Sequence, residues 1–144
     1  MPETVTETYY GDTGQRRRLT KHRSGPTISF EVGGAHGHMT VSTFPDGALA
    51  EIFLRVSKQG STLSGILDGF AISTSIGLQY GVPLATYVSK FVGMRFEPAG
   101  YTDDPEIRRA ESVLDYLFRR LALDFLSPAQ CAELGVTDVV EVSV

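Results

Sequence analysis

The chain has 144 residues, of which 42% are hydrophobic, and its formal net charge is −4. This length and apolar content suit one globular domain that can bury a core without disulfides or metal ions. The single cysteine, Cys131, excludes an internal disulfide, a CxxC redox pair and a Cys-rich zinc site within one chain, and we expect a structural thiol. No apolar run reaches the roughly 18 residues that span a membrane, and residues 1–8 lack a secretory-signal pattern, so we expect a cytoplasmic protein.

Charge is distributed unevenly along the chain. Five of the 13 Lys and Arg residues lie between Arg16 and Arg23, which leaves the rest of the chain strongly acidic. An acidic surface repels nucleic acid, so we expect no nucleic-acid partner. Residues 1–26 are polar and show no apolar periodicity, which predicts a flexible polar and basic arm before a single domain at residues 27–144. The arginines of this arm either bind a phosphate-rich partner or form a solvated connector.

Three strands are predicted in the first half of the domain. Apolar and polar residues alternate over residues 27–32, 38–43 and 49–56. A glycine-rich turn at residues 33–37 joins the first two strands, and Pro45-Asp46-Gly47 supplies a tight turn before the third. Such short connections predict an antiparallel meander.

Two helices are predicted after the meander. Ser61 or Thr62 is expected to cap the first helix, which Gly81 stops. Pro83 is expected in the first turn of the second helix, which ends near Gly93. Helical spacing gives the first of these helices an apolar face that we expect to be its core side: Leu63, Ile66, Leu67, Phe70, Ile76 and Leu78.

The last part of the chain predicts two more helices. An irregular segment at residues 94–100 leads to Asp104, which is expected to cap a long helix that continues to Phe125. Within it, Asp115 and Arg119 have the spacing of an ordinary surface ion pair. A capping box at residues 127–130 opens a short fourth helix, and the valine-rich residues 139–144 favour a strand. Strands followed by helices predict an α+β fold, a three-stranded antiparallel meander followed by three to four helices packed on one face.

Three segments carry candidate ligand-binding residues. In the first, the glycine-rich turn presents His36 and His38, whose backbone could hold a phosphate; the alternative is a hairpin turn that needs glycine conformations. Two histidines without a third nearby ligand do not predict a metal site.

In the second segment, Lys58, Gln59, Gly60 and Ser61 lie where a strand leads into the N-terminus of a helix, which favours anions. This is the strongest sequence candidate for a nucleotide or phosphate contact, and a tight strand-to-helix connection with a serine cap is the alternative. In the third segment, Arg95 and Glu97 stand two residues apart in a loop. They either contact a ligand or form a structural ion pair.

Several long motifs in this chain resemble the C-terminal (TSCPD-type) domain of the adenosylcobalamin-dependent class II ribonucleoside-diphosphate reductases, and most resemble the actinobacterial form. The resemblance covers roughly residues 16–135. The motifs that carry it stand in the same order in this chain: residues 32–35, 45–47, 58–61, 77–83, 95–100 and 115–121.

The resemblance implies a link to nucleotide reduction but not the reaction itself. In that family a long N-terminal barrel holds the radical cysteine, the paired reducing cysteines, the catalytic carboxylate and the adenosylcobalamin site, and none of these has a counterpart here. We therefore expect no catalytic residue and no cofactor in this chain, and no enzymatic activity of the chain alone.

Two functions remain open from the sequence. The first is a stand-alone, non-catalytic accessory or assembly module that binds a reductase catalytic subunit or itself, as a homo-oligomer. The second is a small protein that binds a nucleotide or a phosphate-containing ligand, as a sensor or as a phage-type sponge.

Overall fold

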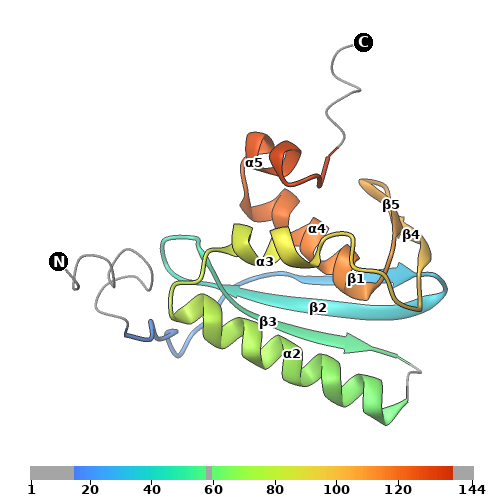
Figure 1. Cartoon of the computed structure of the whole chain (residues 1–144). Coiled ribbons are helices and arrows are strands. Elements are labelled where there is room, and N and C mark those ends of the chain that lie inside the picture. Colours follow the sequence, from blue (N-terminus) through green and yellow to red (C-terminus); the bar gives the residue numbers. More distant parts are fainter. Residues whose placement is uncertain (1–14, 58–59, 138–144) are drawn as a thin grey trace. The chain divides into compact units, whose positions relative to one another are not determined.

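The structure is a computed structural model that describes residues 15–57 and 60–137. The described residues form an α+β fold, as the sequence predicts (Figure 1). Five strands form an antiparallel sheet in the order β3-β2-β1-β4-β5. In chain order the elements are β1 (Thr27–Val32), β2 (Ala35–Thr43), β3 (Leu49–Val56), α2 (Ser61–Gln79), α3 (Leu84–Phe91), β4 (Gly100–Asp104), β5 (Ile107–Ala110), α4 (Val113–Phe125) and α5 (Pro128–Glu133).

The chain divides into two compact units. The first comprises Met1–Ser29 and Gly37–Pro83, and the second comprises Phe30–His36 and Leu84–Val144. The predicted single domain at residues 27–144 stays a prediction. The predicted strand at residues 139–144 lies outside the described residues.

The meander β1-β2-β3 is confirmed, but its first turn is shorter than the sequence predicts. Gly33 and Gly34 alone form the turn, with φ angles of 55° and 87° that glycine adopts without strain. Strand β2 therefore begins at Ala35 rather than at His38, and His36 belongs to the strand. A Cβ on Gly33 would lie 2.4 Å from the Ala99 carbonyl oxygen, so close packing as well as conformation requires glycine there.

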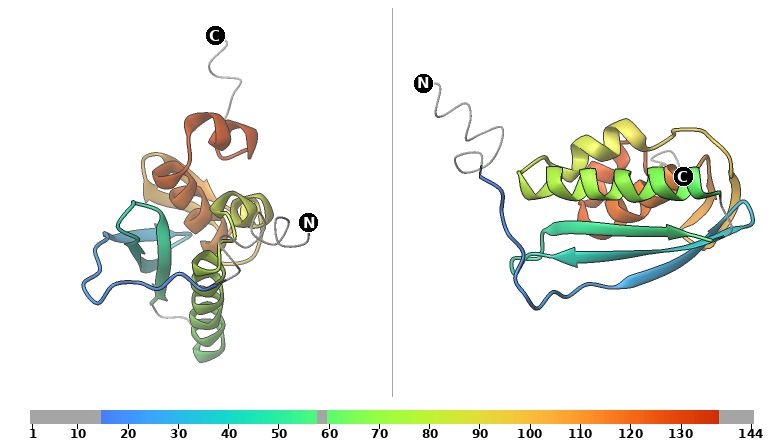
Figure 2. Two further views of the ribbon diagram at one scale, coloured as in Figure 1. Left: turned by 90° about the vertical axis from the view of Figure 1, so that its left-hand side faces the viewer. Right: turned by 90° about the horizontal axis from the view of Figure 1, so that it is seen from below.

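The first unit is held together by α2 packing against β3, the edge strand of the sheet (Figure 2). Ser75 accepts a hydrogen bond from the Ile52 N–H at 2.9 Å, and the Gln79 amide donates to the Ala50 carbonyl at 3.1 Å. These side chains pair backbone groups on the open edge of β3, which would otherwise be unsatisfied. Helix α2 thus covers the edge by polar as well as apolar contacts.

The predicted cap of α2 is wrong and its predicted end is confirmed. Gly60, not Ser61 or Thr62, occupies the N-cap position, and no side chain caps the helix. At the other end α2 stops at Gln79, and Gly81 follows with a φ of 98°.

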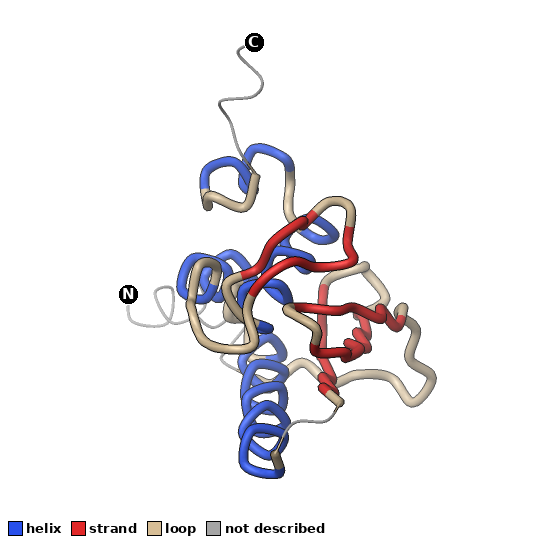
Figure 3. The backbone as a smooth tube through the Cα atoms, turned by 90° about the vertical axis from the view of Figure 1, so that its right-hand side faces the viewer, coloured by secondary structure: helices blue, strands red, loops and turns tan. Residues whose placement is uncertain are grey.

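The second unit contains a hairpin that the sequence pattern does not predict. Strands β4 and β5 pair antiparallel where a helix beginning at Asp104 was predicted (Figure 3). Asp104 accepts a hydrogen bond from the Glu106 N–H at 3.0 Å, so the Asp-Pro-Glu segment forms a turn. Helix α4 begins at Val113, nine residues beyond Asp104, where Ser112 is the N-cap and accepts from the Asp115 N–H.

The core of the second unit is rich in aromatic rings. Phe118 of α4 stacks on Phe91 and on Tyr87 of α3, with ring centroids 5.3 Å and 6.2 Å apart. Tyr116, also on α4, contacts Phe30 at 4.9 Å. The capping box that opens α5 is confirmed, with Ser127 and Gln130 bonded reciprocally.

Candidate functional site

The two histidines of the predicted phosphate turn lie on β2, two positions apart and therefore on the same exposed face. His36 Nε2 lies 3.6 Å from Glu31 Oε1 on the neighbouring strand. The contact described for His36 is thus with a carboxylate of its own fold. A role for either histidine in ligand binding stays a prediction.

The predicted anion site at the start of α2 is only partly described. Lys58 and Gln59 lie outside the described residues. Gly60 and Ser61 are exposed at the helix N-terminus, where Gly60 accepts a hydrogen bond from the Ser64 N–H at 3.1 Å. Phosphate binding at this segment stays a prediction.

Arg95 and Glu97 do not pair with each other. The Arg95 guanidinium instead donates to Glu111 at 2.6 Å, and both side chains of that pair are open to solvent. The structural ion pair between Arg95 and Glu97, one of the two sequence-based alternatives, is therefore wrong. A ligand-binding role for Arg95 or Glu97 stays a prediction.

The buried polar centre of the second unit is Asp115, which the sequence analysis assigned to the surface. Its side chain is 1% exposed. It accepts hydrogen bonds from the Gly93 N–H at 2.6 Å, the Glu111 N–H at 2.8 Å and Arg119 Nε at 2.9 Å. These three hydrogen bonds satisfy the Asp115 carboxylate. They connect the segment after α3 to the start of α4. The i, i+4 spacing correctly predicts the ion pair but not its burial.

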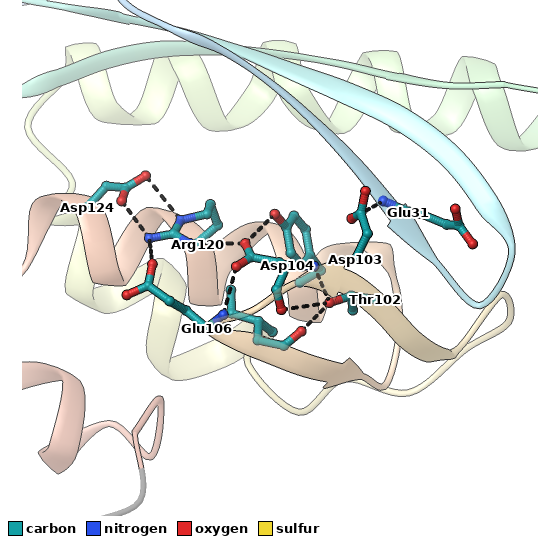
Figure 4. A network of polar contacts seen from close by, with 9 residues as sticks. Glu31, Thr102, Asp103, Asp104, Glu106, Arg120 and Asp124 are labelled. Carbon is teal, nitrogen blue, oxygen red and sulfur yellow. Dashed lines mark hydrogen bonds and ion pairs between the residues drawn. The ribbon is translucent and has the colours of Figure 1, made fainter.

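A second polar cluster, which the sequence pattern does not predict, joins the β4–β5 hairpin to α4 (Figure 4). Arg120 lies within 3.0 Å of Asp104 and of Glu106, and within 2.8 Å of Asp124. Although burial opposes the charge, the hydrogen bonds that Arg120 donates to these carboxylates raise the pKa of Arg120 above its usual value. The guanidinium therefore stays charged and fixes the turn of the hairpin to the helix.

Tyr116 completes this cluster. Its hydroxyl donates to Asp104 Oδ2 at 2.8 Å. Burial raises the pKa of Asp104, but the bonds from Tyr116, the Glu106 N–H and Arg120 outweigh it and hold that pKa below the usual value. Burial, with the Asp104 carboxylate next to it, raises the pKa of Tyr116. The phenol is thus a neutral donor at neutral pH.

In the first unit, the basic segment is attached to the fold rather than held out in solvent. Arg17 lies 2.9 Å from Asp46 and stacks on the Phe44 ring at 3.9 Å. Arg23 lies 2.9 Å from Glu51, which is 8% exposed. The Ala48 N–H and the Arg17 guanidinium hold the pKa of Asp46 below its usual value. At least two of the five basic side chains thus serve the fold itself.

Residues 24–26 extend this attachment along β2. The Val41 N–H donates to the Pro26 carbonyl and the Thr43 N–H to the Ser24 carbonyl, each at 3.1 Å. A Cβ on Gly25 would lie 1.9 Å from the Val41 carbonyl oxygen, so only glycine fits there. The segment before β1 is held against β2 by backbone contacts.

The buried polar side chains in the described part of the chain are all paired. Every buried side-chain nitrogen or oxygen there has a hydrogen-bond partner. The same residues contain no group of three or more His, Cys, Asp or Glu side chains placed to hold a metal ion. Nor does any described helix have the length and apolar character needed to cross a membrane.

Comparisons with known proteins identify the family of this chain. Residues 8–125 match the model of the TSCPD domain. A vitamin B12-dependent ribonucleotide reductase of Streptantibioticus cattleyicolor is 62% identical over 121 residues, which are 84% of this chain and 20% of that protein. The enzyme of the same name from Streptomyces coelicolor is 62% identical over 84% of this chain and 12% of its own length. That from Rhodopirellula baltica is 43% identical over 87% of this chain and 12% of its own length.

This chain spans only about an eighth to a fifth of these relatives. No solved structure matches it. The family model covers most of the chain, from residue 8 to residue 125. The chain therefore belongs to the TSCPD domain family.

Proposed function

We propose that this chain is a non-catalytic accessory or assembly module that works with the catalytic portion of a vitamin B12-dependent ribonucleotide reductase. The observation that carries the proposal is the 62% identity to a small portion of such reductases over 84% of this chain. Identity at that level over most of the chain supports the proposal that this chain has the same binding surface for the catalytic portion as the matching region of those reductases.

The site chemistry supports a structural role for this chain. Asp115, Arg120 and Tyr116 are all bound to groups of their own unit. The single cysteine, Cys131, is 2% exposed, and its thiol donates to the Ala122 carbonyl at 3.3 Å. Burial raises the pKa of this thiol, which disfavours a reactive thiolate.

The described residues do not fit the redox chemistry of the reductase, which in the resembling family uses three cysteines. We include in the proposal that the partner supplies the cysteines and binds adenosylcobalamin, and that this chain acts in the cytoplasm. Self-association of the chain, predicted from its sequence, stays a prediction that sedimentation velocity tests.

The test is reconstitution in two parts. A Streptomyces coelicolor reductase is shortened by the region that matches this chain, and this chain is then added. We expect a stoichiometric complex, a change in ribonucleotide reduction by the shortened enzyme, and no product from this chain alone. The visible spectrum of adenosylcobalamin is expected to stay unchanged on adding this chain alone.

Absence of a complex at tens of micromolar would contradict the proposal. A rise in melting temperature of the isolated chain with a nucleotide, lost in a Lys58→Ala and His36→Ala double variant, would instead support the nucleotide-binding function.

A further inference from the structure

Helix α2 has two different long sides. The side toward β3 is buried. On the opposite side three isoleucines are open to solvent: Ile66 is 62%, Ile72 57% and Ile76 38% exposed. With 3.6 residues per turn, these isoleucines share one arc of the helix with two exposed glycines. The arc also holds exposed Ser73; we call its isoleucines and glycines the α2 outer face: Gly65, Ile66, Gly69, Ile72 and Ile76.

The α2 outer face lacks the charges of an ordinary solvated helix surface. Asp68 is the only charged residue in Ser61–Gln79, and it lies beside this arc rather than within it. Solvent-facing helix surfaces normally carry many charged side chains, whereas a helix that is uncharged on both sides belongs to an interior. Exposed isoleucines grouped on one arc therefore indicate a surface that a partner covers.

No described contact or backbone angle requires glycine at either of these two positions. A Cβ added to Gly65 or to Gly69 would meet nothing within 4 Å, and neither residue has a positive φ. Glycine is among the poorest helix formers, so two of them in mid-helix weaken α2 without a gain from the described packing. Glycine on an outer helix face lets a partner backbone approach closely.

The first described residues of the chain lie next to one end of this face. The Arg17 N–H donates to the Gln79 carbonyl at 2.7 Å, and Arg16 Nε donates to the Gln79 side chain at 2.7 Å. Residues 16 and 17, near the start of the described chain, therefore lie beside the C-terminal end of α2, close to Ile76. In the relatives, 80–88% of the polypeptide lies outside the matched region.

The charge on α2 argues against a second copy as the occupant. Two α2 helices crossing at Gly65 and Gly69 would bring two Asp68 carboxylates into one contact. Helix α2 contains no Lys or Arg to neutralise them. Like charges in one interface cost free energy, whereas a different partner can place a basic group opposite Asp68.

We propose that the α2 outer face is the surface through which this chain binds the catalytic portion of a B12-dependent ribonucleotide reductase. The partner surface is apolar and has a Lys or Arg side chain opposite Asp68. This inference rests on the proposed function, and it names the part of the chain that does the binding.

The experiment measures binding of the full chain to the shortened Streptomyces coelicolor reductase by isothermal titration calorimetry. Gly69→Glu and Ile72→Glu place a charge on the α2 outer face, and both introduce a good helix former at an exposed position. The matched control is Phe53→Glu, which changes an apolar side chain that is 50% exposed on β3. Circular dichroism melting checks that each variant is folded.

We expect each α2 variant to weaken binding at least 30-fold while Phe53→Glu changes it less than threefold. Wild-type affinity in both α2 variants would overturn the inference and leave the proposed function standing. Failure of the wild-type chain to bind would overturn both. A wild-type homodimer that either α2 variant converts into a monomer would overturn the inference by assigning the face to a second copy.

Discussion

Helices α2 and α4 are both long, but they use their side chains in opposite ways. In α4, Asp115, Arg119 and Arg120 all bind groups within their own unit, and Ser112 caps the first turn. In α2 the one charged residue is Asp68, no side chain caps the helix, and isoleucines face solvent. The difference teaches that the polar side chains of α4 find their partners within their own unit. Helix α2 packs one side on its own unit, and we propose that its other side binds a partner.

The largest expected effect is on the α4 side of this comparison. Asp115→Ala removes the acceptor of two backbone N–H groups and the charge partner of Arg119. Because these groups then have no acceptor, we expect a loss of about 3–5 kcal/mol in the free energy of unfolding, measured by urea titration. Asp124→Ala, which removes a surface partner of Arg120, is the control and should cost about 1 kcal/mol or less. Equal effects of the two variants would mean that burial of Asp115 contributes little.

A smaller loss is expected where α2 meets the sheet edge. Ser75→Ala leaves the buried Ile52 N–H without an acceptor, which should cost about 2 kcal/mol. Ser73→Ala, on an exposed position of the same helix, should stay within about 0.5 kcal/mol of wild type. Hydrogen exchange of the Ile52 amide gives a direct reading, and we expect faster exchange in Ser75→Ala alone. Unchanged exchange would show that the edge of β3 does not need α2.

The polar cluster on α4 predicts a pH dependence. Tyr116→Phe removes one donor from Asp104, with an expected cost of about 1.5 kcal/mol at pH 7. The pKa of Asp104 is lowered in the folded state, so its contribution is present above its unfolded pKa and is lost as pH falls through the folded value. The stability difference between wild type and Tyr116→Phe should therefore shrink below about pH 4, which urea titrations at pH 7 and pH 3 measure. A difference that stays constant with pH would exclude an ionised Asp104 as the acceptor.

The smallest effect has the opposite sign and lies on the α2 outer face. Gly69→Ala adds a methyl group into open space and favours the helix, so the isolated chain should gain about 1 kcal/mol. Thermal unfolding of the isolated chain measures this gain. Gly34→Ala is the contrasting control: it also meets open space but has a φ of 87°, so it should be destabilising. A loss of stability in Gly69→Ala would show that this glycine serves the fold.

The sequence predicted helix ends correctly where a single residue type fits the required backbone conformation. Gly81 and the Ser127–Gln130 capping box correctly predicted a helix end and a helix start. The β4–β5 hairpin was missed because Asp104-Pro105 suits a helix start and a tight turn equally, and Ile107 and Ala110 have the spacing of a helical face. Strand pairing between distant residues, Val32 with Thr102, decided between the two.

The sequence alone determined the α+β class, the meander, the extent of α2 and the resemblance to reductase domains, because alternation, helical spacing and long motifs are local properties of the chain. Tertiary structure decided which polar and apolar residues are buried. Ile66 and Leu67 both fit an apolar helix face in the sequence, yet Leu67 is 3% exposed and Ile66 62%. Likewise, Asp115 is a buried acceptor rather than a surface charge because the segment after α3 packs against the start of α4. The physical reason is that burial depends on which elements cover a side chain, and residues far along the chain supply that cover.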